Sequence, residues 1–348
     1  MKFTRRTLLL IAILVLSACG KEPLYQEEGF VFGTRVEVSI YGEEESRARL
    51  SVATIMQEFQ RLHNLLHAWK PSALSELNTA FSHGKSVTVA PELEAMLREA
   101  AQLSEQSGGL FNPAIGGMVK LWGFHADEFK PALPDGKQLA ALVAAQPQMS
   151  DISFHRQKDS IALGSRNRSV QLDFGGYAKG YALDRAAALL KQQGIQHALI
   201  NIGGNVMALG SHGSRSWRVG IQHPRKPGPI ATLELHDGEA IGTSGDYQRY
   251  FELNDKRYCH VIDPRTGQPV QGVEAVTVLT HGVRAGVLSD AASKPLFISG
   301  TGAWLAAAQQ MQLSEALLID TSGTVHLTIA MQKRLEFTDK NTLRKVAQ

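Results

Sequence analysis

Cysteine is scarce in this chain of 348 residues, which contains only Cys19 and Cys259. Two cysteines cannot build the dense disulfide framework on which small secreted domains depend. The net charge of +3 is also small, and no basic stretch with interleaved aromatic residues accompanies it. We therefore expect no nucleic-acid partner. Hydrophobic residues make up 43% of the chain, which is enough to bury a sizeable core.

Long hydrophobic runs are missing as well. The apolar segment from Thr7 to Ala18 is too short for a helix that crosses about 30 Å of hydrocarbon. This segment follows basic residues and ends in small ones, in the sequence MKFTRRTLLLIAILVLSA. Such an arrangement is typical of an export signal, which we assign to residues 1–18.

The end of that signal, LSAC at residues 16–19, resembles the bacterial lipobox, in which cleavage leaves a cysteine that is then acylated. The resemblance implies a lipid anchor at Cys19 and a lipidated linker over residues 19–29. Two or three acyl chains give lasting attachment, at about 0.8 kcal/mol per buried methylene. We therefore expect a lipoprotein of the bacterial cell envelope that faces the periplasm. The choice of membrane and of export route stays open, since Arg5 and Arg6 also resemble a twin-arginine signal.

The remaining residues, 30–348, show no internal repeat and are predicted to form one domain. Alternating apolar residues at Val36, Val38 and Ile40 predict a half-buried strand. Apolar spacing and helix-ending residues predict helices at 45–67, 91–106, 136–145 and 179–193, while strands are predicted at 152–163, 197–202 and repeatedly between 217 and 279. Helices and antiparallel strands are thus mixed without regular alternation. This pattern favours the α+β class over a doubly wound parallel sheet.

The segment LDFGGYAKGYALDRAAALLKQQG, residues 172–194, is the strongest candidate for a phosphate site. Gly175 and Gly176 precede a predicted helix, where backbone amides and the helix dipole attract anions. The spacing fits neither a Walker loop nor a dinucleotide fingerprint. A purely structural alternative is a glycine-rich helix entry capped by Asp173.

Two further segments contain residues suited to a site. Gly203 and Gly204 follow a predicted strand and allow a close backbone approach. His260 lies next to the turn sequence DPRTG, and a polar, uncrowded histidine beside Asp263 can act as a general base at neutral pH. An ordinary core or surface histidine is the alternative interpretation.

Together these segments resemble the ApbE family of FAD:protein FMN transferases. DFGGYAKGYALD, INIGGN, TSGDYQRYF, HVIDPRTG and SDAA occur in the order and approximate spacing of that family, and FGTRVEV, AWKPSALSELN and FNPAIGGMVKLWGF resemble its N-terminal half. The resemblance implies a single T-fold-like α+β domain over residues 30–348. It also implies an enzyme that uses FAD as substrate and Mg²⁺ as cofactor. Such an enzyme joins FMN to a threonine hydroxyl of a periplasmic or membrane flavoprotein and releases AMP.

The resemblance further implies roles for individual residues. His260 matches the catalytic base. The FAD contacts are matched by Phe32, Trp69, Asn112, Pro113, Ala114, Asp173, Lys179 and Ile262. Gly176, through its carbonyl, and Asp290 match metal ligands. Lys294 stands at a third ligand position, where the family usually carries threonine, so the position matches and the residue type does not.

Lys294 and Pro295 therefore mark a departure from the family. Asp290 and Lys294 are four residues apart on a predicted helix, so the lysine can pair with the carboxylate directly. Alternatively, its long stem carries the charge to solvent. Pro295 removes a helical hydrogen bond to the carbonyl of Ala291, at a cost of about 3 kcal/mol. Two hypotheses follow: Lys294 replaces the charge of the metal, or the metal stays, bound by Asp290 and backbone carbonyls only.

Two other functions remain open at this point. A metal-dependent FAD pyrophosphatase would use the same site with water in place of the hydroxyl, and would release FMN and AMP. A non-catalytic FAD-binding lipoprotein would store or deliver the flavin without turning it over.

Overall fold

A computed structural model describes residues 23–126, 128, 130–157 and 160–347. The expected signal peptide, residues 1–18, and the expected anchor Cys19 lie outside these residues. Within them, every helix is too short or too polar to cross a membrane.

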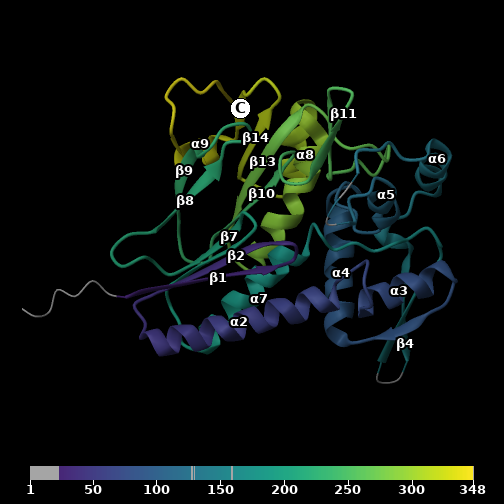
Figure 1. Cartoon of the computed structure of the whole chain (residues 1–348), viewed down its shortest axis with the longest axis horizontal. Coiled ribbons are helices and arrows are strands. Elements are labelled where there is room, and N and C mark those ends of the chain that lie inside the picture. Colours follow the sequence, from purple (N-terminus) through teal and green to yellow (C-terminus); the bar gives the residue numbers. More distant parts are fainter. Residues whose placement is uncertain (1–22, 127, 129, 158–159, 348) are drawn as a thin grey trace, which may run out of the picture.

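A nine-stranded sheet forms the centre of the fold (Figure 1). In spatial order its strands are β1 (Leu24–Val31), β2 (Thr34–Tyr41), β6 (Ala198–Ile202), β7 (Asn205–Leu209), β10 (Ala240–Gly245), β13 (Val273–Thr280), β14 (Glu315–Asp320), β15 (Val325–Leu327) and β17 (Arg344–Val346). Neighbouring strands are antiparallel except for β15 and β17, which are parallel. The described residues therefore form a mainly antiparallel sheet, and the predicted α+β class is confirmed.

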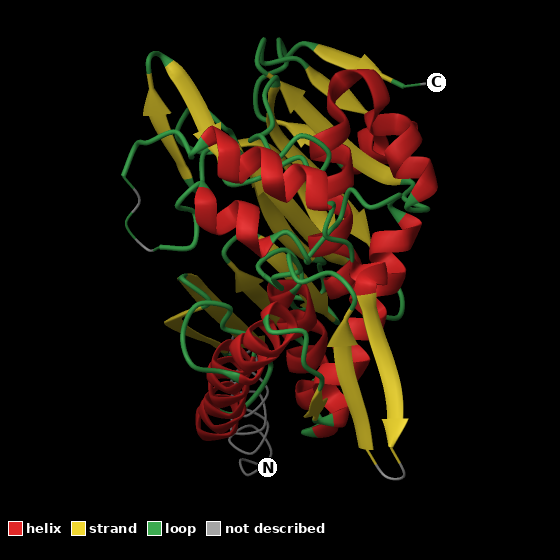
Figure 2. Cartoon of the chain, turned by 90° about the vertical axis from the view of Figure 1, so that its right-hand side faces the viewer, coloured by secondary structure: helices red, strands yellow, loops and turns green. Residues whose placement is uncertain are grey.

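Three smaller sheets accompany the large one. Their strands are β8 (Trp217–Gln222), β9 (Pro229–Leu235) and β16 (Glu336–Phe337) in the first; β3 (Val87–Val89), β5 (Ser160–Ser165) and β4 (Ile152–Gln157) in the second; and β11 (Tyr250–Leu253) and β12 (Lys256–Cys259) in the third. The hairpin of β4 and β5 projects away from the rest of the molecule (Figures 1 and 2). It corresponds to the hairpin predicted at residues 152–163.

The helices have the following bounds: α2 Glu45–Leu65, α3 Ala73–Ser82, α4 Pro91–Gln106, α5 Gly116–Leu121, α6 Gly136–Ala145, α7 Ala178–Gln192, α8 Ala285–Gln310 and α9 Ile329–Arg334, with a 3₁₀ turn at Met149–Asp151. The predicted helices, including the one that carries Asp290 and Lys294, correspond to α2, α4, α6, α7 and α8. Proline at the first position of α4 and an Asp135 side chain that accepts from the Gln138 amide at the start of α6 explain where those two helices begin.

Alternation along β7 divides its apolar side chains between two cores. In β7, Met207 and Leu209 join a core shared with α2 and α7, whereas Val206 and Ala208 join a core shared with β8 and β9. Strand side chains point to opposite faces in turn, so one strand serves both layers. The sheet is thus covered by helices on one face and by the small β8–β9–β16 sheet on the other.

Residues 24–29, which were assigned to a linker, form the greater part of β1. They pair with β2 from Leu24 opposite Tyr41 to Val31 opposite Thr34. The sheet therefore begins six residues before Phe30. Three helices, α3, α5 and α9, were not predicted, because each is short.

Helix α8 passes through Pro295 without a break. Its backbone leaves the helical region only at Gly300, where φ is 62° and ψ is −175°. Glycine adopts a positive φ at little cost, so the kink falls at Gly300. Pro295 therefore costs the helix one hydrogen bond but does not end it.

Helices α7 and α8 cross at two glycines that face each other. A Cβ built on Gly180 would lie 2.3 Å from the carbonyl oxygen of Gly286, and one built on Gly286 would lie 2.4 Å from the carbonyl oxygen of Gly180. Asp184 of α7 then accepts hydrogen bonds from the amides of Gly286 and Val287, each at 2.9 Å. These amides belong to the first turn of α8, where helical partners are missing, so α7 supplies the cap of α8.

We expect Gly180→Ala to lower the free energy of unfolding by about 1–3 kcal/mol, because the added methyl group overpacks the crossing. Urea unfolding followed by circular dichroism measures this change. Gly302→Ala is the matched control, since Gly302 lies in α8 with no atom within 4 Å of its built Cβ. The control should not lower stability, because alanine has a higher helix propensity than glycine and its methyl group meets no neighbouring element here. Equal effects at both glycines would contradict a tight crossing.

Candidate active site

The loop before α7 is held by a second segment from far along the sequence. The carbonyl of Pro113 accepts from the Asp173 amide at 2.8 Å, and that of Ala114 accepts from the Gln171 amide at 3.1 Å. Asn112 is buried, and its side chain donates to the Pro147 carbonyl at 2.9 Å. Residues 112–114 and Asp173, all expected at the site, therefore lie next to each other. The side-chain amide of Asn112 already donates to a partner within the protein.

Asp173 shapes the turn that follows it. Its Oδ1 accepts from the Gly175 amide at 2.9 Å, whereas α7 begins after Tyr177 without a side-chain cap. Asp173 therefore forms a local turn and is not the helix cap of the structural alternative. Burial raises the pKa of Asp173, although the nearby charges of Arg249 and Lys179 act in the opposite direction.

Asp290 lies at the centre of a charged cluster below this loop. Its side chain is 1% exposed, and Oδ2 accepts from the Gly180 amide at 3.0 Å. Oδ1 lies 2.5 Å from Nζ of Lys294 and 3.7 Å from Nζ of Lys179. Burial disfavours the carboxylate, but the two ammonium groups and the amide prevail and hold the pKa of Asp290 well below its usual range.

Lys294 turns inward toward Asp290, and only 17% of its side chain is exposed. Nζ also donates to the backbone carbonyl of Asp290 at 2.7 Å. A Cβ built on Gly176 would lie 3.1 Å from Cε of Lys294. The alternative of a lysine that carries its charge to solvent is therefore wrong.

This arrangement does not fit the expected Mg²⁺. Magnesium requires an octahedron of oxygen ligands, and an ammonium group cannot ligate it. Lys294 lies between Gly176 and Asp290, the two positions that were expected to hold the ion. Among the described residues, no cluster of three or more His, Cys, Asp or Glu side chains could hold a metal elsewhere.

His260 follows the last residue of β12 and is fixed by the carbonyl of Arg249. Its amide donates to this carbonyl at 3.0 Å, and its Nδ1 lies 3.2 Å from the same oxygen. Nδ1 therefore carries the proton, and Nε2 has a free lone pair. Burial first, and then the charges of Lys179, Arg249 and Lys294, lower the pKa of His260 to about 3. The imidazole is neutral at pH 7.

The expected assistance from Asp263 is not observed. The Asp263 carboxylate binds the guanidinium of Arg265 at 2.7 Å, in the turn after the histidine. The charged neighbours that lower the pKa of His260 are cations, so the expectation of an uncrowded histidine beside a carboxylate is wrong. Sequence proximity suggested Asp263, whereas the chain places the backbone of Arg249 against the ring.

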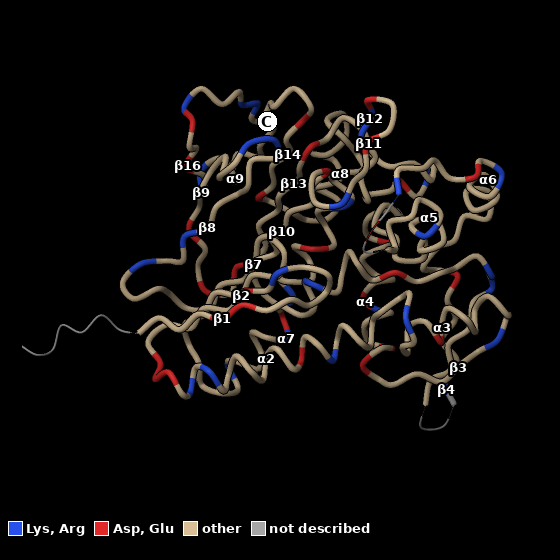
Figure 3. The backbone as a smooth tube through the Cα atoms, in the orientation of Figure 1, with Lys and Arg blue, Asp and Glu red and all other residues tan. Residues whose placement is uncertain are grey.

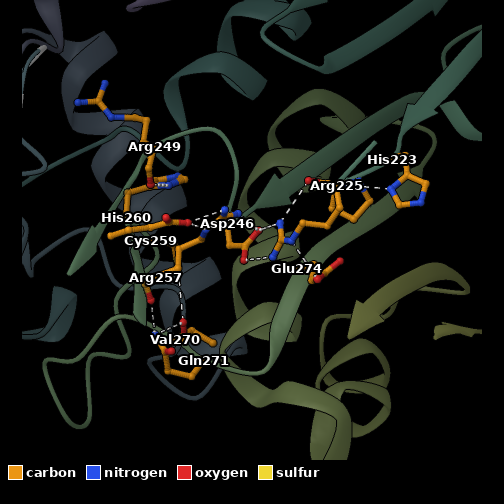
Figure 4. A network of polar contacts seen from close by, with 12 residues as sticks. His223, Arg225, Asp246, Arg249, Arg257, Cys259, His260, Val270, Gln271 and Glu274 are labelled. Atoms are coloured by element: carbon orange, nitrogen blue, oxygen red, sulfur yellow. Dashed lines mark hydrogen bonds and ion pairs between the residues drawn. The ribbon is translucent and has the colours of Figure 1, made fainter. Parts of the chain in front are cut away.

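An ionic network with two buried carboxylates, Asp246 and Glu274, lies near His260 (Figure 4). Arg225 binds both oxygens of Asp246, at 2.7 and 2.6 Å, and Glu274 at 3.1 Å. Arg257 of β12 lies 3.8 Å from the same Asp246. The network joins the end of β10 to β12 and β13, and so fixes the strand that presents the histidine.

The thiol of Cys259 belongs to the same region. It lies 3.8 Å from the Val261 carbonyl and 3.6 Å from the Val270 carbonyl. Burial raises the pKa of Cys259 to about 12. The thiol is therefore a packing group and not a nucleophile.

Arg249 is a site residue that the sequence analysis did not single out. Its guanidinium donates to the carbonyls of Phe124 and Ala126, at 2.9 and 2.7 Å. Its charge acts on both Asp173 and His260. The signal was its place within TSGDYQRYF, one of the segments that resemble the ApbE family.

Aromatic side chains lie on the neighbouring helical layer. Phe32 adopts a positive φ of 57° in the turn between β1 and β2 and packs against Phe59, with ring centroids 6.2 Å apart. The Trp69 ring lies 5.4 Å from that of His125 and borders a cavity of about 880 Å³. Ile262 is buried in a separate apolar cluster with Trp122 and Phe124, so its side chain supports the site from behind.

Positive charges are concentrated at the candidate site, in contrast to the rest of the described chain. Along the whole described chain, acidic and basic residues are interspersed, and helix α2 carries both signs (Figure 3). By contrast, Lys179, Arg249 and Lys294 all act on the one imidazole of His260. Three cations whose charges act on a neutral histidine, together with a glycine-rich helix start, suit a substrate with a phosphate or pyrophosphate group.

Comparison with known proteins gives a consistent result. The ApbE family model matches residues 32–318. An FAD:protein FMN transferase of Rhodobacter capsulatus is 42% identical over 314 residues, which are 90% of this chain and 59% of that protein. A protein of the same name from Klebsiella pneumoniae is 30% identical over 89% of this chain and 94% of its own length.

Solved structures agree with this result. The ApbE protein of Thermotoga maritima superimposes with a TM-score of 0.81 at 25% identity, over 90% of this chain and 99% of that one. The apo flavinyl transferase ApbE of Pseudomonas stutzeri gives 0.77 at 25% identity, over 91% and 98%.

The low pKa of His260 makes stability depend on pH. The unfolded chain, with an ordinary histidine pKa of 6.5, takes up a proton that the native protein does not accept until about pH 3. The free energy of unfolding should therefore fall as the pH drops from 6.5 toward 3, and His260→Gln should reduce this slope. In the wild type, the Cε1–H resonance of His260 should not shift between pH 5.5 and 8. A midpoint near 6.5 in that titration would refute the assignment.

Proposed function

The chain belongs to the ApbE family, and we propose that it transfers the FMN part of FAD to a threonine hydroxyl of a target protein, with release of AMP. The observation that carries this proposal is His260, whose Nδ1 contact with the Arg249 carbonyl leaves Nε2 as the base, together with the cations Lys179 and Lys294 that both approach Asp290. A base and several cations at one place are what attack on a pyrophosphate requires.

In the proposed reaction, the threonine oxygen attacks the phosphorus on the FMN side of the pyrophosphate. The new phosphorus–oxygen bond forms while the bond to the AMP phosphate breaks, and AMP leaves with the electron pair. The ammonium groups of Lys179 and Lys294, which both approach Asp290, balance the negative charge that develops on the leaving AMP. The start of α7 adds the positive end of a 15-residue helix.

His260 takes the proton of the attacking hydroxyl at Nε2. Its Nδ1 proton stays on the Arg249 carbonyl and keeps the ring in the required tautomer. A pKa near 3 makes a weak base, but the cationic neighbours are one cause of that value. A bound pyrophosphate would offset their charge and raise the pKa, so the base becomes effective when the substrate is present.

Mg²⁺ is the least supported part of the expected mechanism. One form of the proposal retains the ion on Asp290 and backbone carbonyls. The inward position of Lys294 argues against this form, and we assign no step to the metal.

The acceptor is proposed to be an exported or membrane flavoprotein. This part depends on the export signal and lipobox read from residues 1–19. Incubation of the protein with FAD and candidate periplasmic flavoproteins, followed by intact-mass analysis, tests it.

His260→Ala should lower transfer by about 10²- to 10⁴-fold, the usual contribution of a general base, while FAD affinity is retained. Intact-mass analysis of the acceptor measures covalent FMN, and fluorescence quenching measures FAD binding. His83→Ala, at an exposed position on α3's C-terminal end, is the control and should transfer at the wild-type rate. Undiminished transfer by His260→Ala would refute the role. Free FMN and AMP without acceptor labelling would favour a pyrophosphatase, and FAD binding without turnover would favour a carrier.

Trp69 is expected to stack on a ring of FAD. Trp69→Ala should weaken FAD binding by about 1–3 kcal/mol, which is roughly 5- to 150-fold in Kd. Trp69→Phe keeps an aromatic face and should retain most of the affinity. Isothermal titration with FAD measures both variants. An alanine variant with wild-type affinity would place the rings of FAD elsewhere.

A further inference from the structure

We propose that the ammonium group of Lys294 takes the place of the metal ion in this site, so that the protein binds FAD and transfers FMN without a divalent cation. The inference deepens the proposed function and depends on it for the transfer step. Its binding consequences can be tested independently.

The first argument is the position of the ammonium group. Asp290 and Lys294 lie one helical turn apart on α8, so their side chains share a face. Nζ is within hydrogen-bond distance of both the carboxylate and the backbone carbonyl of Asp290, at 2.5 and 2.7 Å. The stem of the lysine lies against Gly176, where any larger residue would crowd Cε. The cation thus lies between the loop and the helix that would otherwise share an ion.

The second argument is the local charge. Asp290 contributes −1, and Lys179 and Lys294, which both approach its Oδ1, contribute +1 each, so the three sum to +1. The carboxylate is already neutralised by its two cations. A divalent ion at the same place would bring the sum to +3 around one buried carboxylate, and like charges at such distances repel strongly.

The third argument is the bonding capacity of the ammonium group. Lysine has three N–H donors, and Asp290 uses two of them, through Oδ1 and the carbonyl. One N–H remains for a phosphate oxygen of the substrate. Charge-assisted hydrogen bonds of this kind are short and strong. The lysine ammonium acts as a compact positive charge, so it can bind a phosphate oxygen without the fixed ligand geometry that a metal ion requires.

Lys294→Thr is the decisive variant, because it removes the ammonium and leaves a hydroxyl beside Asp290. In the presence of EDTA, the wild-type full-length protein should bind FAD with the same Kd as with excess Mg²⁺. The variant should lose about tenfold or more in FAD affinity in EDTA, a loss typical of one charged hydrogen bond, and should regain it with Mg²⁺. Lys191→Thr, at an exposed position in the last turn of α7, should behave as the wild type.

Direct binding of Mn²⁺, followed by electron paramagnetic resonance, gives a readout that does not involve activity. With FAD present, and after subtraction of binding to FAD alone, the wild type should bind no stoichiometric Mn²⁺ and Lys294→Thr should bind one ion. Stoichiometric Mn²⁺ on the wild type that is lost in Asp290→Asn would overturn the inference. Loss of wild-type FAD binding in EDTA would overturn it as well.

Transfer assays separate this inference from the proposed function. Wild-type transfer that persists in EDTA supports both, whereas transfer that requires Mg²⁺ overturns the inference alone. If binding follows the expected pattern but no acceptor is labelled under any condition, the proposed function fails and the metal-free site stands. If Lys294→Thr does not fold, as judged by circular dichroism, the Mn²⁺ and EDTA results on the wild type decide the question.

Discussion

The carboxylate of Asp290 is the group on which the arrangement of this site depends. It accepts the amide of Gly180 from α7 and pairs with lysines from both α7 and α8. Its side chain is almost fully buried, so none of these contacts can be exchanged for water without cost. In return, Asp184 of α7 binds the first amides of α8. Each helix thus supplies a carboxylate to the other, and the glycine-rich loop before α7 is fixed at the point where they cross.

The close crossing is what makes these exchanges possible. Glycines at 180 and 286 bring the two backbones within reach, so that short aspartate side chains can bridge them. The network of Arg225, Asp246 and Glu274, which Arg257 joins to β12, fixes the strand that precedes His260. The histidine and the cations therefore come from separate parts of the chain, each held by its own ionic contacts.

The sequence predicted the parts of the fold that follow from local periodicity. The helix at 91–106, with proline at its start, and the alternation of Val36, Val38 and Ile40 both appear as expected. Residues 24–29 were missed because YQEEG is polar and carries no apolar alternation, and their pairing with β2 makes them a strand.

The candidate site likewise contains residues that local sequence signals predict and contacts that no such signal predicts. Motifs placed Asp173, Lys179, His260 and Asp290 together, because their glycine and turn residues are local signals. The direction of Lys294 could not be predicted, since a long stem can reach solvent or a carboxylate equally well, and burial decides between them. The partner of His260 is a carbonyl, which every residue has, so no pattern of side chains could reveal it.

The buried thiol beside this histidine has a consequence for how the protein tolerates its surroundings. A thiol with a pKa near 12 is almost entirely protonated at neutral pH, and only the thiolate reacts readily with oxidants or disulfides. The Cys259 sulfur near the site therefore reacts little with oxidants or disulfides. The strand that presents His260 would keep its shape whether the compartment is oxidising or reducing, without help from disulfide-forming machinery.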